Sequence, residues 1–257
     1  MSDSDTPAIL RGLRRFTPAR IGLGRVGNGL PTTAHLQFQA AHAAARDAVH
    51  SALDVVALRA RLAAAGVDTV AVKSICPDRP TFLLRPDLGR TLDPDDATAL
   101  AARPLPGCFA VVLADGLSAL AVASHAPALL ELLLPRLGPS VVVIATQARV
   151  ALGDHVGAAL RAAATLVLIG ERPGLSAADS LGAYLTWGPA VGRTDAERNC
   201  VSNIRPEGLA VPAAADKLLW LIAEMRRLGL TGVGLKDEQA LALGSEAQDR
   251  SIPMVTT

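Results

Sequence analysis

The sequence has few aromatic residues and few cysteines for its length of 257 residues. Phe, Trp and Tyr make up only 3% of the chain, although half of all residues are hydrophobic. The hydrophobic core must therefore consist of closely packed Ala, Leu, Val and Ile, as helices on a sheet allow. The three cysteines, Cys76, Cys108 and Cys200, form no C-x-x-C pair, which argues against both a disulfide framework and a zinc site.

An excess of charge of one sign is also missing. The formal net charge is +1, from 25 basic and 24 acidic side chains, and neither sign forms a block. Nucleic acid is therefore not expected as a partner. The N-terminal stretch "MSDSDTPAILRGLRRFTPAR" lacks an apolar h-region, and no apolar run approaches the ~20 residues of a membrane span. These features predict a cytoplasmic protein that is neither exported nor inserted into a membrane.

The first part of the chain differs in pattern from the rest. Residues 1–20 are polar and without periodicity, so we expect residues 1–32 to form a mobile N-terminal arm followed by a glycine-rich docking segment. The stretch "GLGRVGNGL" has G-x-G-x-x-G spacing at Gly22, Gly24 and Gly27. No strand pattern precedes it and no helix pattern begins within it, which disfavours a dinucleotide site. Residues 33–67 have apolar residues at helical spacing and are predicted to form a helical segment.

Short apolar runs alternate with helical stretches in residues 68–257. Strands are predicted at 69–74, 108–115, 140–146, 165–171 and 183–187. The intervening stretches, such as "GLSALAVASHAPALLELLLPRLG" and "DHVGAALRAAA", are predicted helices, and an amphipathic helix closes the domain. Helices that alternate with buried, Val-rich strands favour an α/β fold with a doubly wound, mostly parallel, Rossmann-like sheet and a helical N-terminal extension.

Polar residues follow three of the predicted strands, near Asp115, Val150 and Glu171. Because ligands bind outside the carboxyl ends of parallel strands, we expect these segments to meet at one edge of the sheet. Asp115 is best explained as part of a turn that caps the next helix. Glu171 is predicted to accept hydrogen bonds from a ligand. The structural alternatives for Glu171 are an ion pair with Arg172 and a helix cap near residues 176–180.

The polar stretch "TDAERNCVSNIRPEGL" at 194–209 lies outside any periodic segment. It is predicted to be a long loop of the kind that often forms a binding site. Its thiol, Cys200, is equally consistent with ligand contact and with a small buried hydrophobic residue. The five histidines, including His155, lack the spaced partners that a metal site requires. No nucleophile–base pattern or carboxylate pair is found either, so no catalytic centre is predicted.

Six longer stretches of the sequence carry a family resemblance. They are "RFTPARIGLGRVGNGLPT", "HLQFQAAHAAARDAVH", "RPDLGRTL", "ADGLSA", "GERPGLSAADSLGAYLTW" and "RTDAERNCVSNIRPEGL". Together they resemble the small subunit of ethanolamine ammonia-lyase, over a region from about Arg15 to Gly234.

This resemblance implies a subunit of an adenosylcobalamin-dependent enzyme that converts ethanolamine to acetaldehyde and ammonia. In that family the large subunit holds the substrate and the catalytic side chains, while the small subunit covers the cobalamin. Residues 68–257 would then form a cobalamin-clamping domain in a hetero-oligomer. By position, the family's cofactor contacts fall on Val150, Glu171 and Cys200. The chain lacks a D-x-H-x-x-G segment, which implies that it supplies no ligand to cobalt.

Two questions remain open at this point. One is whether the complex is enclosed in a bacterial microcompartment. The other is an alternative function, in which the chain is a stand-alone α/β protein that binds a nucleotide or another small molecule without catalysis.

Overall fold

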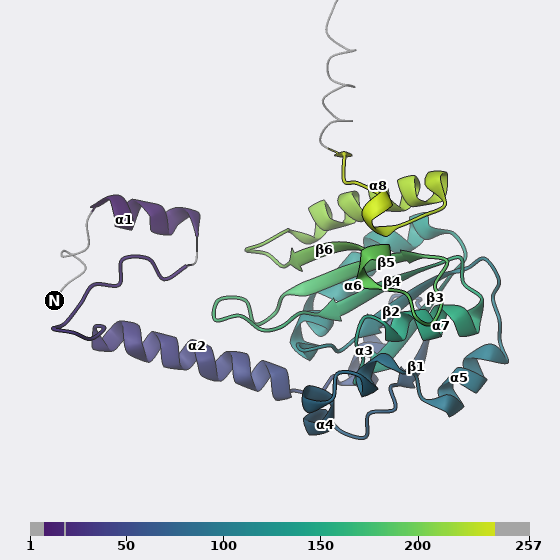
Figure 1. Ribbon diagram of the computed structural model, residues 1–257, viewed down its shortest axis with the longest axis horizontal. Coiled ribbons are helices and arrows are strands. Elements are labelled where there is room, and N and C mark those ends of the chain that lie inside the picture. The colour runs from purple at the N-terminus through teal and green to yellow at the C-terminus, as the bar shows by residue number, and fades with distance from the viewer. Residues whose placement is uncertain (1–7, 18, 240–257) are drawn as a thin grey trace, which may run out of the picture.

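Helices and strands alternate along most of the chain (Figure 1). The computed structural model describes residues 8–17 and 19–239. Its strands are β1 (Thr69–Lys73), β2 (Phe109–Ala114), β3 (Ser140–Thr146), β4 (Ala164–Gly170), β5 (Leu181–Trp187) and β6 (Asn199–Ile204). Its helices are α1 (Ala8–Leu13), α2 (Thr32–His50), α3 (Val55–Ala64), α4 (Arg79–Leu84), α5 (Pro94–Ala101), α6 (Ala119–Leu137), α7 (Leu152–Leu160) and α8 (Val211–Leu228).

The strands form one mixed sheet in the order β1-β3-β2-β4-β5-β6. The neighbours β1, β3, β2 and β4 are parallel, whereas β5 pairs antiparallel with both β4 and β6. The predicted α/β class is confirmed. The sheet is mixed because β5 runs opposite to its neighbours, while β6, antiparallel to β5, has the same direction as β1 to β4. The physical reason is the link between Gly170 and Leu181, which contains no helix and cannot provide the long crossover that a parallel strand requires.

Alternate residues of the central strands face two separate cores. In β2, Phe109, Val111 and Leu113 pack in one cluster with residues of α3, α6 and α8. Ala110 and Val112 pack in a second cluster with residues of α5 and α7. Every residue of β2 is buried, as expected for a strand that is covered on both faces. Burial of this apolar surface is the main force that holds the helices against the sheet.

Helix α6 is the central helix of the first core. By length and composition alone it is apolar enough to cross a membrane, and half of the window that meets this criterion is buried in the structure. Val122, Ala126, Leu129 and Leu133 are among its fully buried residues. We expected no apolar run near the ~20 residues of a membrane span. That expectation is corrected, because α6 has 19 residues and is a core helix.

The short helices α1, α4 and α5 were not predicted. α1 has six residues and lies in the stretch that we expected to be a mobile arm without periodic structure. The other two are α4 and α5. They contain six and eight residues, too few turns to produce a clear helical periodicity. Each begins at an aspartate whose side chain accepts a hydrogen bond from a first-turn amide, Asp78 for α4 and Asp93 for α5. These N-caps stabilise helices that would be marginal by length alone.

The polar stretch at 194–209 contains strand β6, where the sequence predicts a loop. Its two buried residues, Val201 and Ile204, are three positions apart, so the period of two that marks a strand is absent. Asn203 has a φ of 59°, and the pairing of β6 with β5 shifts its register. Because of this irregularity, and because its polar residues have low strand propensity, the sequence pattern does not predict the strand.

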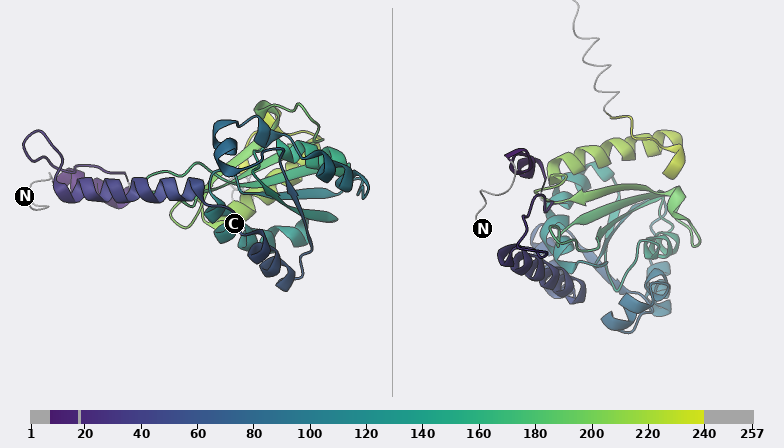
Figure 2. Two further views of the ribbon diagram at one scale, coloured as in Figure 1. Left: turned by 90° about the horizontal axis from the view of Figure 1, so that it is seen from below. Right: turned by 60° about the vertical axis from the view of Figure 1, so that its left-hand side comes forward.

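Helix α2 extends away from the α/β body (Figures 1 and 2). Two alanines are its only buried residues, whereas Leu36 and Phe38 are exposed. The helix is anchored at its C-terminal end, where the Val49 carbonyl accepts a hydrogen bond from Arg79 Nε at 2.8 Å. An exposed apolar surface on a helix that leaves the body is typical of a protein interface.

Candidate functional site

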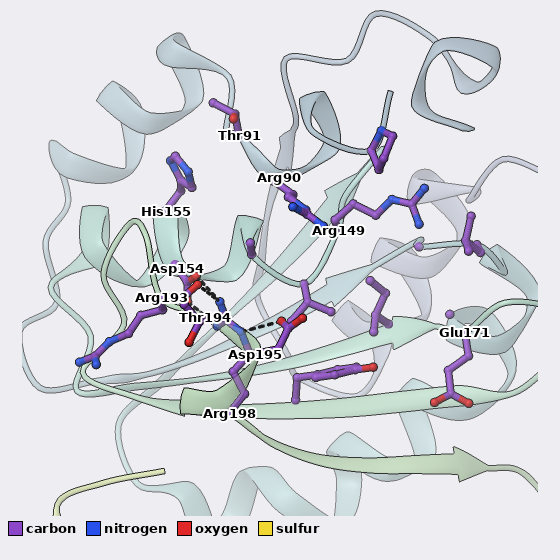
Figure 3. Close-up of a pocket in the computed structure, with 18 of the residues that line it drawn as sticks. Arg90, Thr91, Arg149, Asp154, His155, Glu171, Arg193, Thr194, Asp195 and Arg198 are labelled. Carbon is purple, nitrogen blue, oxygen red and sulfur yellow. Dashed lines mark hydrogen bonds and ion pairs between the residues drawn. The ribbon is translucent and has the colours of Figure 1, made fainter. Parts of the chain in front are cut away.

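A cavity of about 880 Å³ opens at the carboxyl edge of the parallel strands (Figure 3). The turns that follow β2, β3 and β4 all contribute to its lining, through Gly116, Val150 and Glu171 among others. The prediction that these three strand ends meet at one edge is confirmed. Small-molecule sites usually measure about 300–1,000 Å³, so this cavity can hold a large ligand.

The cavity exists because helix α7 covers only part of its face of the sheet. α7 packs on β2 and β4. Beyond it, Tyr184 of β5 and Ser202 of β6 line the cavity directly. The loop between these two strands adds Arg193, Thr194 and Asp195. The cavity is therefore bounded by strand ends, by the uncovered face of the sheet and by the β5–β6 loop.

Two glycines allow β2 and β4 to end close together at the cavity. Gly116 has a φ of +52°, and a Cβ there would lie 2.3 Å from the Gly170 carbonyl oxygen. A Cβ on Gly170 would lie 2.0 Å from the Ser118 carbonyl oxygen. The Leu117 amide donates a hydrogen bond to the Gly170 carbonyl at 2.9 Å. No larger residue fits at either position, so this contact fixes the point from which Glu171 enters the cavity wall.

Asp115 holds the turn after β3 in place. Its buried carboxylate accepts hydrogen bonds from the amides of Gln147 at 2.9 Å and Ala148 at 3.0 Å, and from Arg79 Nη1 at 3.2 Å. Burial raises the pKa of Asp115, and these hydrogen bonds and the Arg79 charge oppose that shift. The prediction that Asp115 belongs to a turn that caps the next helix is confirmed, because Ser118 Oγ at the end of that turn accepts a hydrogen bond from the Ala121 amide at the start of α6.

Glu171 lies at the end of β4, and donors of this chain hold its carboxylate. Ser180 Oγ donates at 2.5 Å, Ser202 Oγ at 2.6 Å and the Asn203 amide at 3.2 Å. A carboxylate offers about four acceptor positions, so about one is left for a ligand. In Figure 3 the Glu171 carboxylate points away from the other labelled residues, towards the lower strands.

Both structural alternatives for Glu171 are contradicted. Within the described ranges the Glu171 carboxylate bonds to two hydroxyl groups and one amide, and forms no ion pair with Arg172. Residues 176–180 form turns rather than a helix that could be capped. The carboxylate instead joins the link after β4 to strand β6, and so shapes this wall of the cavity.

Cys200 lies beside the cavity lining. It pairs across the sheet with Tyr184, which does line the cavity. The residue is exposed, so the alternative of a small buried hydrophobic residue is contradicted. Shielding by the surrounding atoms raises the pKa of the Cys200 thiol, the Tyr184 hydroxyl lowers it and the Glu171 charge raises it. With the pKa raised from 9.0, the thiol is uncharged near neutral pH.

The structure thus brings two of the three predicted contact residues into one cavity. Val150 and Glu171 both line the cavity. Cys200 is not part of the lining, but it pairs across the sheet with Tyr184, which is. Val150 sits in the turn between β3 and α7, where it packs partly against the second core.

The cavity also contains a buried ion pair that no sequence pattern singles out. Arg198, just before β6, donates from Nη1 and Nη2 to the two carboxylate oxygens of Asp154 on α7, at 2.7 and 2.6 Å (Figure 3). Arg198 also donates to Thr186 Oγ1 at 3.0 Å and to the Arg193 carbonyl at 2.9 Å. The two partners are 44 positions apart, and no spacing rule links residues at that separation.

His155 lines the cavity beside Asp154. Burial lowers the pKa of His155, opposed by the Asp154 charge, so its imidazole is neutral at pH 7. Among the residues described, no three His, Cys, Asp or Glu side chains gather as metal ligands. The lining combines hydrogen-bond acceptors, arginine donors and apolar surface, which suits the binding of a large mixed-polarity ligand.

Comparison with known proteins shows similarity over nearly the whole chain. Residues 8–236 match the family model described as ethanolamine ammonia-lyase light chain (EutC). The chain is 54% identical over 239 residues to the ethanolamine ammonia-lyase small subunit of Azotobacter vinelandii, covering 90% of this chain and 88% of the relative. It is 53% identical over 251 residues to that of Bradyrhizobium diazoefficiens, covering 93% and 95%. For Rhodopseudomonas palustris the identity is 51% over 258 residues, covering 96% and 98%.

Proposed function

Because this chain belongs to the ethanolamine ammonia-lyase light-chain family, we propose that it covers and helps to bind adenosylcobalamin against the large subunit of that lyase. Its relatives are named small subunits, so it is one component of a lyase complex and has a large-subunit partner. The reaction of the complex is the conversion of ethanolamine to acetaldehyde and ammonia. The large subunit holds the substrate and the reacting side chains, and this chain is required for activity without supplying them.

The observation that carries the proposal is the composition of the cavity at the carboxyl edge. Cobalamin has a corrin ring edged with amide side chains, and it also carries a ribose and a phosphodiester. The amide and hydroxyl donors of such a ligand need acceptors like Glu171 and Ser202, while its apolar surface suits Val150. The residues present therefore fit the cofactor.

Each of the three proposed contact residues has a distinct role. Val150 provides apolar contact from the turn after β3. Glu171 uses its remaining acceptor position for an amide or hydroxyl of the cofactor. Cys200 contacts the cofactor as an uncharged thiol from the edge strand β6. A corrin with its nucleotide loop is larger than this cavity, so the large subunit covers the remainder.

Adenosylcobalamin, when bound, supplies the radical chemistry of the reaction. The residues of this chain position it and exclude water from one side. The Asp154–Arg198 pair holds the β5–β6 loop against α7. Asp115 fixes the turn that carries Val150. A closed, dry site of this kind limits side reactions.

The proposed contact with the large subunit is the exposed apolar surface of the segments that precede the α/β body in the sequence. It includes Leu36 and Phe38 on α2, and Phe16 and Val26 before it. In this division residues 1–32 are the N-terminal arm and the glycine-rich docking segment, and α1 lies within the arm. Residues 33–67 form the helical extension, and residues 68–257 form a doubly wound, Rossmann-like clamping domain. Residues 1–7, 18 and 240–257 lie outside the described part of the chain.

The proposed setting is the bacterial cytoplasm, and enclosure of the complex in a microcompartment is compatible with it. Neither nucleic acid nor a membrane is a proposed partner. The chain has a formal net charge of +1 and no block of charge, which gives no basis for binding a polyanion.

Co-expression with the large subunit tests the proposal. With adenosylcobalamin added, the complex should convert ethanolamine to acetaldehyde, and this chain alone should not. Cobalamin-dependent turnover by the purified chain would contradict the clamping role. The alternative function, a stand-alone binder of a nucleotide or small molecule, predicts instead that the isolated chain binds a nucleotide at micromolar affinity and that the large subunit is active without it.

A further inference from the structure

Three arginines line one end of the cavity, and we refer to Arg90, Arg149 and Arg172 as the arginine corner. Arg90 ends the short 3-10 turn Leu88–Arg90, Arg149 follows β3 and Arg172 follows β4. Segments that are far apart in the sequence therefore bring three guanidinium groups to the same cavity. In Figure 3 the side chains of Arg90 and Arg149 lie near each other above the sheet.

The arginine corner lacks counter-ions within the described part of the chain. There the side chains of Arg90 and Arg172 make no hydrogen bond or ion pair. Arg149 makes one long hydrogen bond to a carbonyl oxygen, at 3.5 Å, and its Nε is buried without a partner. The nearby carboxylate of Asp115 is already bound to Arg79 and to two backbone amides. The corner therefore carries positive charge that the surrounding protein does not neutralise.

These positive charges act on one another. Burial lowers the pKa of Arg149, and the charges of Arg79, Arg90 and Arg172 lower it further, opposed in part by the charge of Asp115. Like charges that crowd in a partly buried site destabilise it unless an anion is bound among them. An anionic ligand would remove this repulsion.

Arg149 is held in a fixed position before any ligand arrives. Its guanidinium lies 4.4 Å from the centre of the Phe82 ring, and the Arg79 guanidinium lies 4.9 Å from the same centre. The Arg149 amide donates to the Gly89 carbonyl at 2.8 Å. A Cβ on Gly89 would come within 2.7 Å of the Phe82 ring and 3.0 Å of Arg149 Cγ. This close packing leaves Arg149 little rotamer freedom to lose when it binds.

The chemistry of the corner favours phosphate over a carboxylate. A guanidinium group matches two oxygens of a phosphate with two parallel N–H donors. A phosphate offers several oxygens in different directions, so arginines from three segments can bind it together. We propose that Arg90, Arg149 and Arg172 bind the phosphate group of the ligand that occupies this cavity.

The proposal rests on the proposed function for the source of that phosphate. If the ligand is a cobalamin, the group is the phosphodiester of its nucleotide loop. If the ligand is a nucleotide, the group is a nucleotide phosphate. The shared chemistry is a phosphate ester, and the two sources can be separated by experiment.

The test compares two corrinoids on the complex of this chain with the large subunit. Cyanocobalamin contains the phosphodiester, whereas cyanocobinamide lacks the phosphate, the ribose and the base. Their dissociation constants are measured by equilibrium dialysis for the wild type, Arg149→Gln and Arg90→Gln. The matched control is Arg103→Gln, an exposed arginine before β2 at the opposite edge of the sheet. AMP and inorganic phosphate are tested on the isolated chain.

We expect Arg149→Gln and Arg90→Gln each to weaken cyanocobalamin binding by about 10-fold or more, since each removes charge-assisted hydrogen bonds. Cyanocobinamide binding should stay unchanged, and Arg103→Gln should affect neither corrinoid. Equal losses for both corrinoids, or no loss for either, would overturn the proposal. Arg149 is packed against Phe82, so its substitution can also disturb the fold. Arg90 is exposed and keeps the test decisive in that case.

Failure of the proposed function has a different signature. If the wild-type complex binds neither corrinoid, the cobalamin assignment fails. The phosphate proposal then depends on the isolated chain. Binding of AMP or inorganic phosphate that is lost in both Arg90→Gln and Arg149→Gln would support it, with a nucleotide as the source. Absence of binding to all four probes would overturn both proposals.

Discussion

Asp154 and Arg198 form a two-point ion pair in which each side chain is only 2% exposed. Asp154 belongs to α7, and Arg198 directly precedes β6. The pair therefore connects the helix that follows the Val150 turn to the segment that carries Cys200. Both partners are buried and both carboxylate oxygens accept hydrogen bonds, the geometry of a strong charge-assisted pair.

Removing one partner of this pair should destabilise the fold. Asp154→Asn leaves the Arg198 charge buried without a counter-ion, and the free energy of unfolding should fall by about 3–5 kcal/mol. The control is Asp87→Asn, in a surface pair with Arg85 whose side chains are 57% and 59% exposed. That substitution should leave the free energy of unfolding nearly unchanged, because solvent screens an exposed pair. Urea unfolding of both variants measures the difference, and equal losses would show that burial of the Asp154–Arg198 pair is not what matters.

Glu171→Gln should weaken cofactor binding by about tenfold in the assembled complex. It keeps the size of the side chain but replaces a charge-assisted hydrogen bond, worth about 1.5–3 kcal/mol, with a neutral one of about 1 kcal/mol. Glu171→Ala should cost more, because the donors on the cofactor are left unpaired. Ethanolamine affinity should change much less, since the substrate lies in the other subunit.

Ser180→Ala is the matched control for Glu171. The Ser180 hydroxyl is buried, donates to the Glu171 carboxylate at 2.5 Å and does not line the cavity. Its removal should lower the melting temperature of the chain and leave cobalamin affinity nearly unchanged. Isothermal titration with cyanocobalamin and thermal melts on the same samples separate the two effects. Unaltered cofactor affinity in Glu171→Ala would remove Glu171 from the binding site.

Gly116→Ala should destabilise the chain by more than a change of backbone preference alone. A Cβ at this position would lie 2.3 Å from the Gly170 carbonyl oxygen, so the ends of β2 and β4 must separate. Gly229→Ala is the control, because Gly229 has a φ of +68° and its nearest neighbour to a Cβ would lie at 3.9 Å. The control should cost about 1–2 kcal/mol from the left-handed conformation. A similar loss for both variants, measured by denaturant unfolding, would contradict the close approach of the two strands.

Glu197 should make the β5–β6 loop sensitive to acid. Hydrogen bonds from the Thr194 amide and from Arg193 lower the pKa of Glu197 from 4.5 to about 2. A carboxyl group whose folded pKa is depressed stabilises the fold above its unfolded value and loses that effect as pH falls through the folded value. The loop should therefore lose stability between about pH 4.5 and pH 2. An NMR titration of the Glu197 carboxyl would test this, and a midpoint near 4.5 would contradict it.

The sequence predicts the elements that have a strong period and misses those that do not. β2 to β4 are continuous apolar runs, and their carboxyl ends meet as expected. β6 escapes prediction because the positive φ of Asn203 and a register shift break its alternation. The reversal of β5 follows from a link too short for a crossover, a property that strand patterns do not report.

The site was predictable where it depends on strand ends and unpredictable where it depends on long-range contacts. Val150 and Glu171 follow buried strands, and that position alone points to the carboxyl edge. The partners of Glu171 come from residues 180, 202 and 203, which only the fold brings to it. The arginine corner likewise combines residues from three separate turns, each unremarkable in the sequence.

The affinity of the complex for cobalamin tests the central claim most directly. Cyanocobalamin binding should be measured for the large subunit alone and for the large subunit with this chain, at the same ionic strength. If this chain covers and helps to bind the cofactor, the complex should bind at least about tenfold more tightly, equivalent to about 1.4 kcal/mol of added contacts. Equal affinity with and without this chain would contradict the clamping role.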